Sequence, residues 1–175
     1  MKKITLILIL FVGFLSFAQP STFMDLGNLG PAGTFTFDTN NSLNTAPFAG
    51  NTDTAIGLWD AAGIVIASDD DGGTGAWSTV TETLADGEYY IGIGEFNCVF
   101  TDGFLNTGSG FESGELADLV LNIDGVEAGV HVGASDALDQ ETAFFKVTIG
   151  TPTPSSTFCS EETPLPIDPP TVFST

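Results

Sequence analysis

Residues 53–94 decide the fold, and they read DTAIGLWDAAGIVIASDDDGGTGAWSTVTETLADGEYYIGIG. Short runs of alternating apolar and polar side chains are separated here by turns rich in Asp and Gly. Asp opens such turns and Gly tolerates their backbone, so this pattern is typical of antiparallel strands joined by tight connections. The stretch predicts a hairpin of strands 54–60 and 64–68, followed by strands 77–84 and 88–95.

The same alternation continues on both sides of this stretch. It predicts further strands at 33–38, 117–124, 126–133 and 142–149, with polar or Gly-rich loops at 40–50 and 96–111. No amphipathic segment suited to a crossover helix lies between the strands. The chain is therefore expected to be all-β, an antiparallel, jelly-roll-like β-sandwich of about eight strands.

The two ends of the chain differ in composition from this domain. Residues 1–18 combine Lys2 and Lys3 with an apolar run that ends in small residues, which is the pattern of a cleaved signal peptide. The expected product is an exported bacterial protein, secreted or at the cell surface. It would comprise an N-terminal lead (19–32), the β-sandwich domain (33–150) and a Pro-rich tail or linker (151–175).

The charge of the chain restricts its partners. Beyond residue 18 the sequence contains 23 acidic residues and Lys146 as its single basic residue, a net charge of −22. Such a surface repels nucleic acid and anionic membranes. Cations, neutral glycans or basic proteins remain as partners, and the acid excess can also serve solubility alone.

An acidic loop is the best candidate for a metal site. Asp69, Asp70 and Asp71 precede two glycines, and Ca²⁺ prefers several hard oxygen ligands of this kind. Asp53 and Asp60 lie at the two ends of the preceding strand, so either can contribute if the loop folds back. The alternative is a solvated loop in which Asp side chains cap turns.

Catalytic motifs are missing from the sequence. The single histidine, His131, lies in the strand VEAGVHVG, and no nucleophile elbow, zinc-protease motif or phosphate loop occurs. We therefore expect no catalytic residue and a non-enzymatic role. Cys98 and Cys159 permit one disulfide in an exported protein, which would join the tail to the domain.

Aromatic side chains suggest a second kind of site. Trp59 and Trp77 fall on faces that the alternation places outward, where a flat ring can stack on a sugar. Four phenylalanines gather in one loop, and they either add to such a surface or cover one end of the core: Phe96, Phe100, Phe104 and Phe111.

The stretch 53–94 resembles the bacterial pre-peptidase C-terminal domain. The matching residues are Asp53-Thr54, Ile56, Leu58, Asp60, Gly63, Ile66-Ala67-Ser68, Asp69-Asp70-Asp71, Leu84, Gly87, Tyr89-Tyr90 and Ile91. Residues 33–38 and 117–149 fit the outer strands of that family loosely. The resemblance implies a non-enzymatic sandwich that accompanies secreted modules, some relatives of which hold Ca²⁺ and bind collagen or carbohydrate.

These observations together predict an exported, non-enzymatic β-sandwich module for extracellular or cell-surface binding, stabilised by Ca²⁺. Two alternatives stay open. One is a structural or secretion-assisting accessory domain of a larger secreted hydrolase, although residues 1–32 hold no catalytic domain. The other is a carbohydrate-binding module, which requires Trp59 or Trp77 to be exposed.

Overall fold

The computed structural model describes residues 20, 22–46, 50–95, 98–107, 116–135 and 142–151, and it is built from strands. Their bounds are β1 (Met24–Asn28), β2 (Gly33–Asp38), β3 (Leu43–Ala46), β4 (Gly50–Asn51), β5 (Thr54–Asp60), β6 (Val65–Asp69), β7 (Thr79–Leu84), β8 (Gly87–Glu95), β9 (Phe100–Thr101), β10 (Leu105–Asn106), β11 (Leu116–Ile123), β12 (Val126–Ser135) and β13 (Ala143–Ile149). The prediction of an all-β fold is confirmed. No helix capable of crossing a membrane occurs in this part of the chain.

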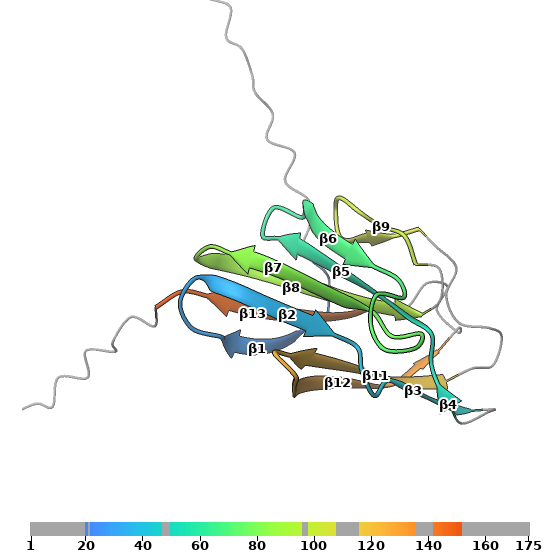
Figure 1. The fold of residues 1–175 in the computed structure, drawn as a ribbon. Helices are drawn as coiled ribbons and strands as arrows, with labels where there is room; N and C mark the ends of the chain where they lie inside the picture. Colours follow the sequence, from blue (N-terminus) through green and yellow to red (C-terminus); the bar gives the residue numbers. More distant parts are fainter. Residues whose placement is uncertain are drawn as a thin grey trace, which may run out of the picture.

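The strands form two packed sheets (Figure 1). The five-stranded sheet has the order β1-β13-β8-β5-β6, and only its edge pair β1–β13 is parallel. The six-stranded sheet has the order β4-β3-β11-β2-β7, with β12 also paired to β11. A small β9–β10 hairpin forms a separate sheet.

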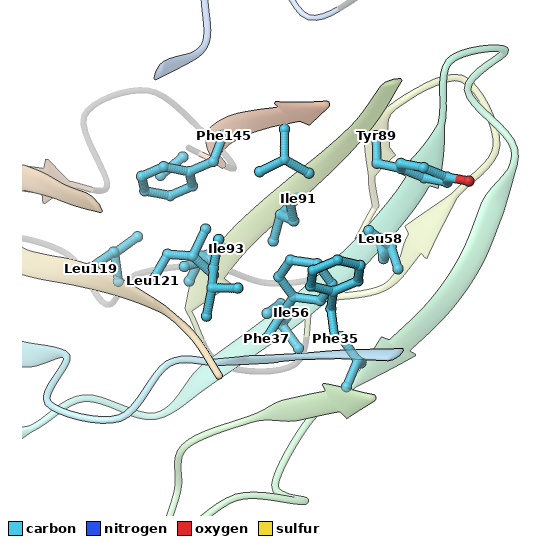
Figure 2. Close-up of a cluster of buried hydrophobic side chains, with 14 of the residues drawn as sticks. Phe35, Phe37, Ile56, Leu58, Tyr89, Ile91, Ile93, Leu119, Leu121 and Phe145 are labelled. Carbon is cyan, nitrogen blue, oxygen red and sulfur yellow. The ribbon is translucent and has the colours of Figure 1, made fainter. Parts of the chain in front are cut away.

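The space between the sheets is filled by the inward residues of each alternating strand. Figure 2 shows Phe35, Phe37, Ile56, Leu58, Tyr89, Ile91, Ile93, Leu119, Leu121 and Phe145 in contact across this core. Ile56, Leu58, Ile91 and Ile93 are fully buried, as expected for inward positions of the central strands β5 and β8.

A second apolar layer covers the outer face of the five-stranded sheet. It joins Trp59 and Tyr90 to Phe100 and Phe104 of the β9–β10 hairpin. The hairpin approaches closely because Gly57 presents no side chain there: a Cβ on Gly57 would lie 2.7 Å from the Phe100 ring. Gly92 leaves room for the Trp59 ring, since a Cβ there would lie 2.8 Å from it.

This layer corrects the assignment of Trp59 to an exposed face. The alternation correctly separates Trp59 from Ile56 and Leu58, but its ring is fully buried beneath the hairpin. Of the four loop phenylalanines, Phe100 and Phe104 are buried in this cover, whereas Phe96 and Phe111 lie outside the described residues.

Several short strands were not predicted. β3 and β4 lie in the segment 40–50 that the sequence indicates as a loop, β1 lies in the N-terminal lead, and β9 and β10 lie in the Phe-rich loop. Each has two to five residues and no sustained apolar alternation, because its position at a sheet edge or on the surface requires none. The signal peptide (1–18) and the tail beyond Thr151 lie outside the described residues.

Candidate functional site

The acidic loop lies at the end of the sandwich where β6 leaves the five-stranded sheet for β7. β5 and β6 are antiparallel, with Ile56 opposite Asp69. Asp53, just before β5, is therefore brought alongside the loop that follows β6. The structure thus places Asp53, one of the two strand-end acids considered, with Asp70 and Asp71.

The carboxylates of this acidic end repel one another. The pKa of Asp53 is raised, first by burial and then by the charges of Asp71 and Asp70. The pKa of Asp70 is raised in the same way, by burial and by Asp71 and Asp69. In addition, Oδ1 of Asp53 is buried and accepts no hydrogen bond. The site thus carries more negative charge than its surroundings compensate, which favours a bound cation.

Asp69 has a structural part in the loop. Its Oδ2 accepts hydrogen bonds from the main-chain N–H groups of Gly72 and Thr79, each at 2.8 Å. A Cβ on Gly72 would lie 2.6 Å from the same carboxyl group. Asp69 therefore caps the turn, which is the role that the alternative interpretation of the loop assigns to its Asp residues.

Asp60 is not part of the acidic end. Asp60 is the last residue of β5, at the other end of the strand from Asp53, and it pairs with Tyr89 of β8. Its Oδ1 accepts hydrogen bonds from the N–H groups of Ala62 and Ile64, both at 2.9 Å. The suggestion that Asp60 joins the loop carboxylates is wrong, because the length of β5 separates them.

A buried polar layer underlies the acidic end, and the sequence analysis did not anticipate it. Thr39, Thr54 and Ser78 are fully buried, with the Thr39 and Thr54 hydroxyl oxygens 2.5 Å apart. The Ser78 hydroxyl donates to the Thr54 carbonyl, and the Ser78 N–H donates to the Thr39 hydroxyl at 2.8 Å. These bonds fix the connections that cross between the two sheets.

Glu95 extends this layer from the end of β8. Its carboxyl group is almost fully buried and accepts a hydrogen bond from the Thr52 hydroxyl, one residue before Asp53. A glutamate directly after the apolar run YYIGIG is the one sequence signal that could have indicated a buried acid here.

In the described part of the chain, no three His, Cys, Asp or Glu side chains are grouped as ligands for one metal ion. The charges of Asp53, Asp70 and Asp71 interact, so these three side chains lie near one another. They would have to converge further for all three to hold one cation. Carboxylate oxygens of this kind would suit Ca²⁺.

Trp77 borders the acidic loop, whereas His131 lies away from it. Trp77 is half-buried, and its indole N–H donates to the Ser42 carbonyl at 3.1 Å. His131 lies on β12 of the six-stranded sheet. The Trp77 carbonyl accepts the Gly73 N–H at 2.7 Å, so Trp77 closes the acidic loop through its main chain.

Cys98 lies under the five-stranded sheet's outer cover. Its thiol donates to the Glu95 carbonyl and accepts from the Asn106 amide at 2.9 Å, and burial raises its pKa to about 11. Such a thiol is a poor nucleophile near neutral pH. Its predicted partner, Cys159, lies outside the described residues.

Comparison with known proteins identifies no relative. No protein-family model, curated protein or solved structure matches the chain. The candidate site must therefore be interpreted from its own geometry.

Proposed function

We propose that this protein is an exported, non-enzymatic β-sandwich module that acts in extracellular or cell-surface binding and is stabilised by Ca²⁺ at its acidic end. The observation that carries the proposal is the group of Asp53, Asp70 and Asp71. The pKa of Asp53 and of Asp70 is raised first by burial and then by the charges of the neighbouring carboxylates. A divalent cation would remove this repulsion and connect the start of β5 to the loop after β6.

The location of the group supports a stabilising role. The loop between β6 and β7 and the residues before β5 both pass from one sheet to the other, and Thr54 N–H donates to the Ala76 carbonyl at 3.0 Å between them. A cation here would hold two crossovers together. The resemblance of residues 53–94 to the pre-peptidase C-terminal domain supports the same role in a secreted binding module.

The test is a thermal melt of the secreted full chain in EDTA, in millimolar Ca²⁺ and in millimolar Mg²⁺. Saturation at about 100 times Kd adds about 2.7 kcal/mol. For a domain of this size that corresponds to a Tm increase of about 5–11 °C.

The matched variants are Asp53→Asn and Asp70→Asn, with Glu127→Gln as the control. Glu127 is an exposed acid on β12, away from the loop. We expect the Ca²⁺ shift to be lost in the two loop variants and kept in the control. Equal small shifts with Ca²⁺ and Mg²⁺, unchanged in all variants, would reduce the effect to general screening and reject the site.

A further inference from the structure

The free edges of the two sheets differ in how they are protected. Edge strands expose unpaired main-chain groups, and natural proteins interrupt them with bulges, glycines or caps, or keep them very short. Such devices occur at β1, β4, β6 and β12. Among the strands described, β7 has such a device only at its first residue, where Asp69 caps Thr79.

The protected edges can be compared directly. The β1–β13 pair shifts register between Asp25 and Asn28, and β4 has two residues. The β5–β6 pair shifts beside Trp59, and the outward N–H of Val65 is occupied by Asp102 Oδ1 at 2.9 Å. The β11–β12 pair contains two register shifts.

β7, drawn in green in Figure 1, is regular by comparison. It pairs with β2 at six consecutive positions, from Gly33–Leu84 to Asp38–Thr79, with no register shift. Its sequence TVTETL contains no proline, glycine or lysine. It therefore retains the regular geometry that an added strand requires.

The hydrogen bonds of Thr36 show which main-chain groups of β7 are free. Thr36 donates its N–H to Asp124 Oδ1 at 2.9 Å, and its carbonyl accepts the Asp124 N–H at 2.8 Å. Its main chain thus faces away from β7, so Thr36 and Thr81 form a pair without mutual main-chain hydrogen bonds. The N–H and C=O of Thr81 consequently point to the open side, and by alternation so do those of Thr83.

Thr79 supports this orientation. It has the same parity as Thr81, and its outward N–H is bound by Asp69 Oδ2 at 2.8 Å. That carboxylate caps the first outward position of β7 and leaves the next two uncapped. Thr81 and Thr83 are both exposed.

We propose that the β7 edge binds an extended, basic segment of a partner protein as an added antiparallel or parallel strand. Main-chain hydrogen bonds to Thr81 and Thr83 would supply the pairing. Charge complementarity selects the partner: Glu82 lies on β7, Asp69 at its start and Asp86 just beyond its end. A second copy of this chain is a poor occupant, since each copy carries a net charge of −22 beyond residue 18.

This inference deepens the proposed binding role and rests on it by naming the surface and the class of partner. The probe is a synthetic eight-residue peptide of alternating Lys and Val, with a Glu/Val peptide as the charge control. Binding to the secreted full chain is measured by fluorescence anisotropy, and amide exchange at Thr81 and Thr83 by NMR.

The variant Thr81→Pro removes an outward N–H and is compatible with an edge position. Its control, Thr81→Val, keeps the N–H and loses only the hydroxyl that lies 3.0 Å from that of Thr36. We expect Thr81→Pro to weaken the basic peptide roughly tenfold or more and Thr81→Val to leave binding nearly unchanged. Slower exchange of the Thr81 and Thr83 amides is expected on binding. N-methylation of the peptide main chain should abolish both the binding and the slower exchange.

Equal binding by Thr81→Pro, equal binding of the acidic peptide, or no binding of the basic peptide would each overturn the inference. So would a dimer of the chain that Thr81→Pro dissociates, because the occupant would then be a second copy. The Ca²⁺ melt is independent of this edge. A retained Ca²⁺ shift with failed peptide binding therefore rejects the β7 inference alone, and a lost Ca²⁺ shift rejects the cation site.

Discussion

The indole N–H of Trp59 donates a hydrogen bond to the main-chain carbonyl of Thr101, 2.9 Å away. This bond joins the central strand β5 to the β9–β10 hairpin, and it satisfies the one polar atom of a fully buried ring. Phe100 meets the same ring edge to face, with centroids 5.3 Å apart. Trp59 is thus the anchor by which the sandwich holds its outer cover.

Replacement of Trp59 should destabilise the domain strongly. We expect Trp59→Ala to lower the free energy of unfolding by about 3–5 kcal/mol, as for other large buried aromatic residues. Trp59→Phe should lose less, chiefly the bond to Thr101, at about 0.5–1.5 kcal/mol plus some packing. Urea unfolding followed by circular dichroism measures both, and Trp77→Phe is the control for a half-buried indole. A loss in Trp77→Phe as large as in Trp59→Ala would contradict the assigned anchor.

The glycines under the hairpin provide a second test. Gly57→Ala would place a Cβ 2.7 Å from Phe100 and 2.8 Å from Trp59, so it should destabilise the domain by about 1–3 kcal/mol. Gly50→Ala is the matched control, because its Cβ would meet no atom within 4 Å. Phe100→Leu in the Gly57→Ala background should recover part of the loss. Identical melting temperatures for the two single variants would show that the hairpin does not pack on Gly57.

The acidic end should make stability depend on pH in a defined direction. A raised carboxyl pKa in the folded state means that the folded state takes up protons more readily than the unfolded chain, so these carboxylates reduce stability above that pKa. Asp70→Asn should therefore raise Tm by about 1–3 °C at pH 7 and low salt, since Asp70 is exposed and screened. Below the ordinary aspartate pKa of 3.8 the difference should vanish. A stabilisation that persists unchanged at low pH would exclude charge repulsion as its cause.

The ion pair of Lys146 with Asp25 should make stability depend on pH in the opposite direction. Its Nζ lies 3.3 Å from Asp25 and 3.0 Å from Glu88, and the pKa of Asp25 is lowered by a hydrogen bond from Gly27 N–H and by Lys146. Asp25 therefore contributes stability above the unfolded pKa of 3.8 that is lost as pH falls through the lower folded value.

The variant Lys146→Met keeps the aliphatic stem and removes the charge. We expect faster hydrogen exchange of the Leu29 amide, which donates to the Thr148 carbonyl at 2.9 Å and reports the attachment of β1 to β13. Lys146→Arg should retain slow exchange. High salt should reduce the difference between the variants, because exposed ion pairs are screened. Equal exchange in Lys146→Met and the parent chain would show that the ion pairs do not hold β1.

Two hydrogen bonds between threonine hydroxyls, one buried and one exposed, allow their contributions to stability to be compared. Thr54→Val removes one of the hydrogen-bond partners of the buried Thr39 hydroxyl and should cost about 1–3 kcal/mol. Thr34→Val breaks the exposed contact of Thr34 with Thr83, at 2.9 Å, and should change stability by less than about 0.5 kcal/mol. Chemical denaturation of both variants provides the comparison, and equal losses would refute the special role of the buried layer.

The central strands were predictable because each has an inward and an outward face. Ile56 and Leu58 alternate with Gly57 and Trp59, and Ile91 and Ile93 alternate with Gly92, so the period of two identifies β5 and β8 directly. β1 escaped prediction because its residues are largely exposed at a sheet edge, and β3 because it has only four residues; neither carries such a period.

Tertiary packing explains the remaining errors. Alternation separates the two faces of β5 but contains no information about a distant hairpin that covers the second face, so Trp59 was placed outward. The glycines at 57 and 92 were the available sign of that cover. The sequence left both Asp53 and Asp60 open as neighbours of the acidic loop, and only the pairing of β5 with β6 puts Asp53 at the loop and Asp60 at the other end of the strand.

The position of Lys146 also has a consequence for resistance to proteases. Beyond residue 18 it is the only residue after which a trypsin-like protease can cut. Its peptide unit lies within β13, between β1 and β8 on either side. A protease must bind such a segment as a separated, extended chain, so the native fold conceals the single susceptible bond. Digestion by trypsin should then report unfolding of the sandwich by one cleavage, and the folded protein should persist where enzymes of this specificity are abundant.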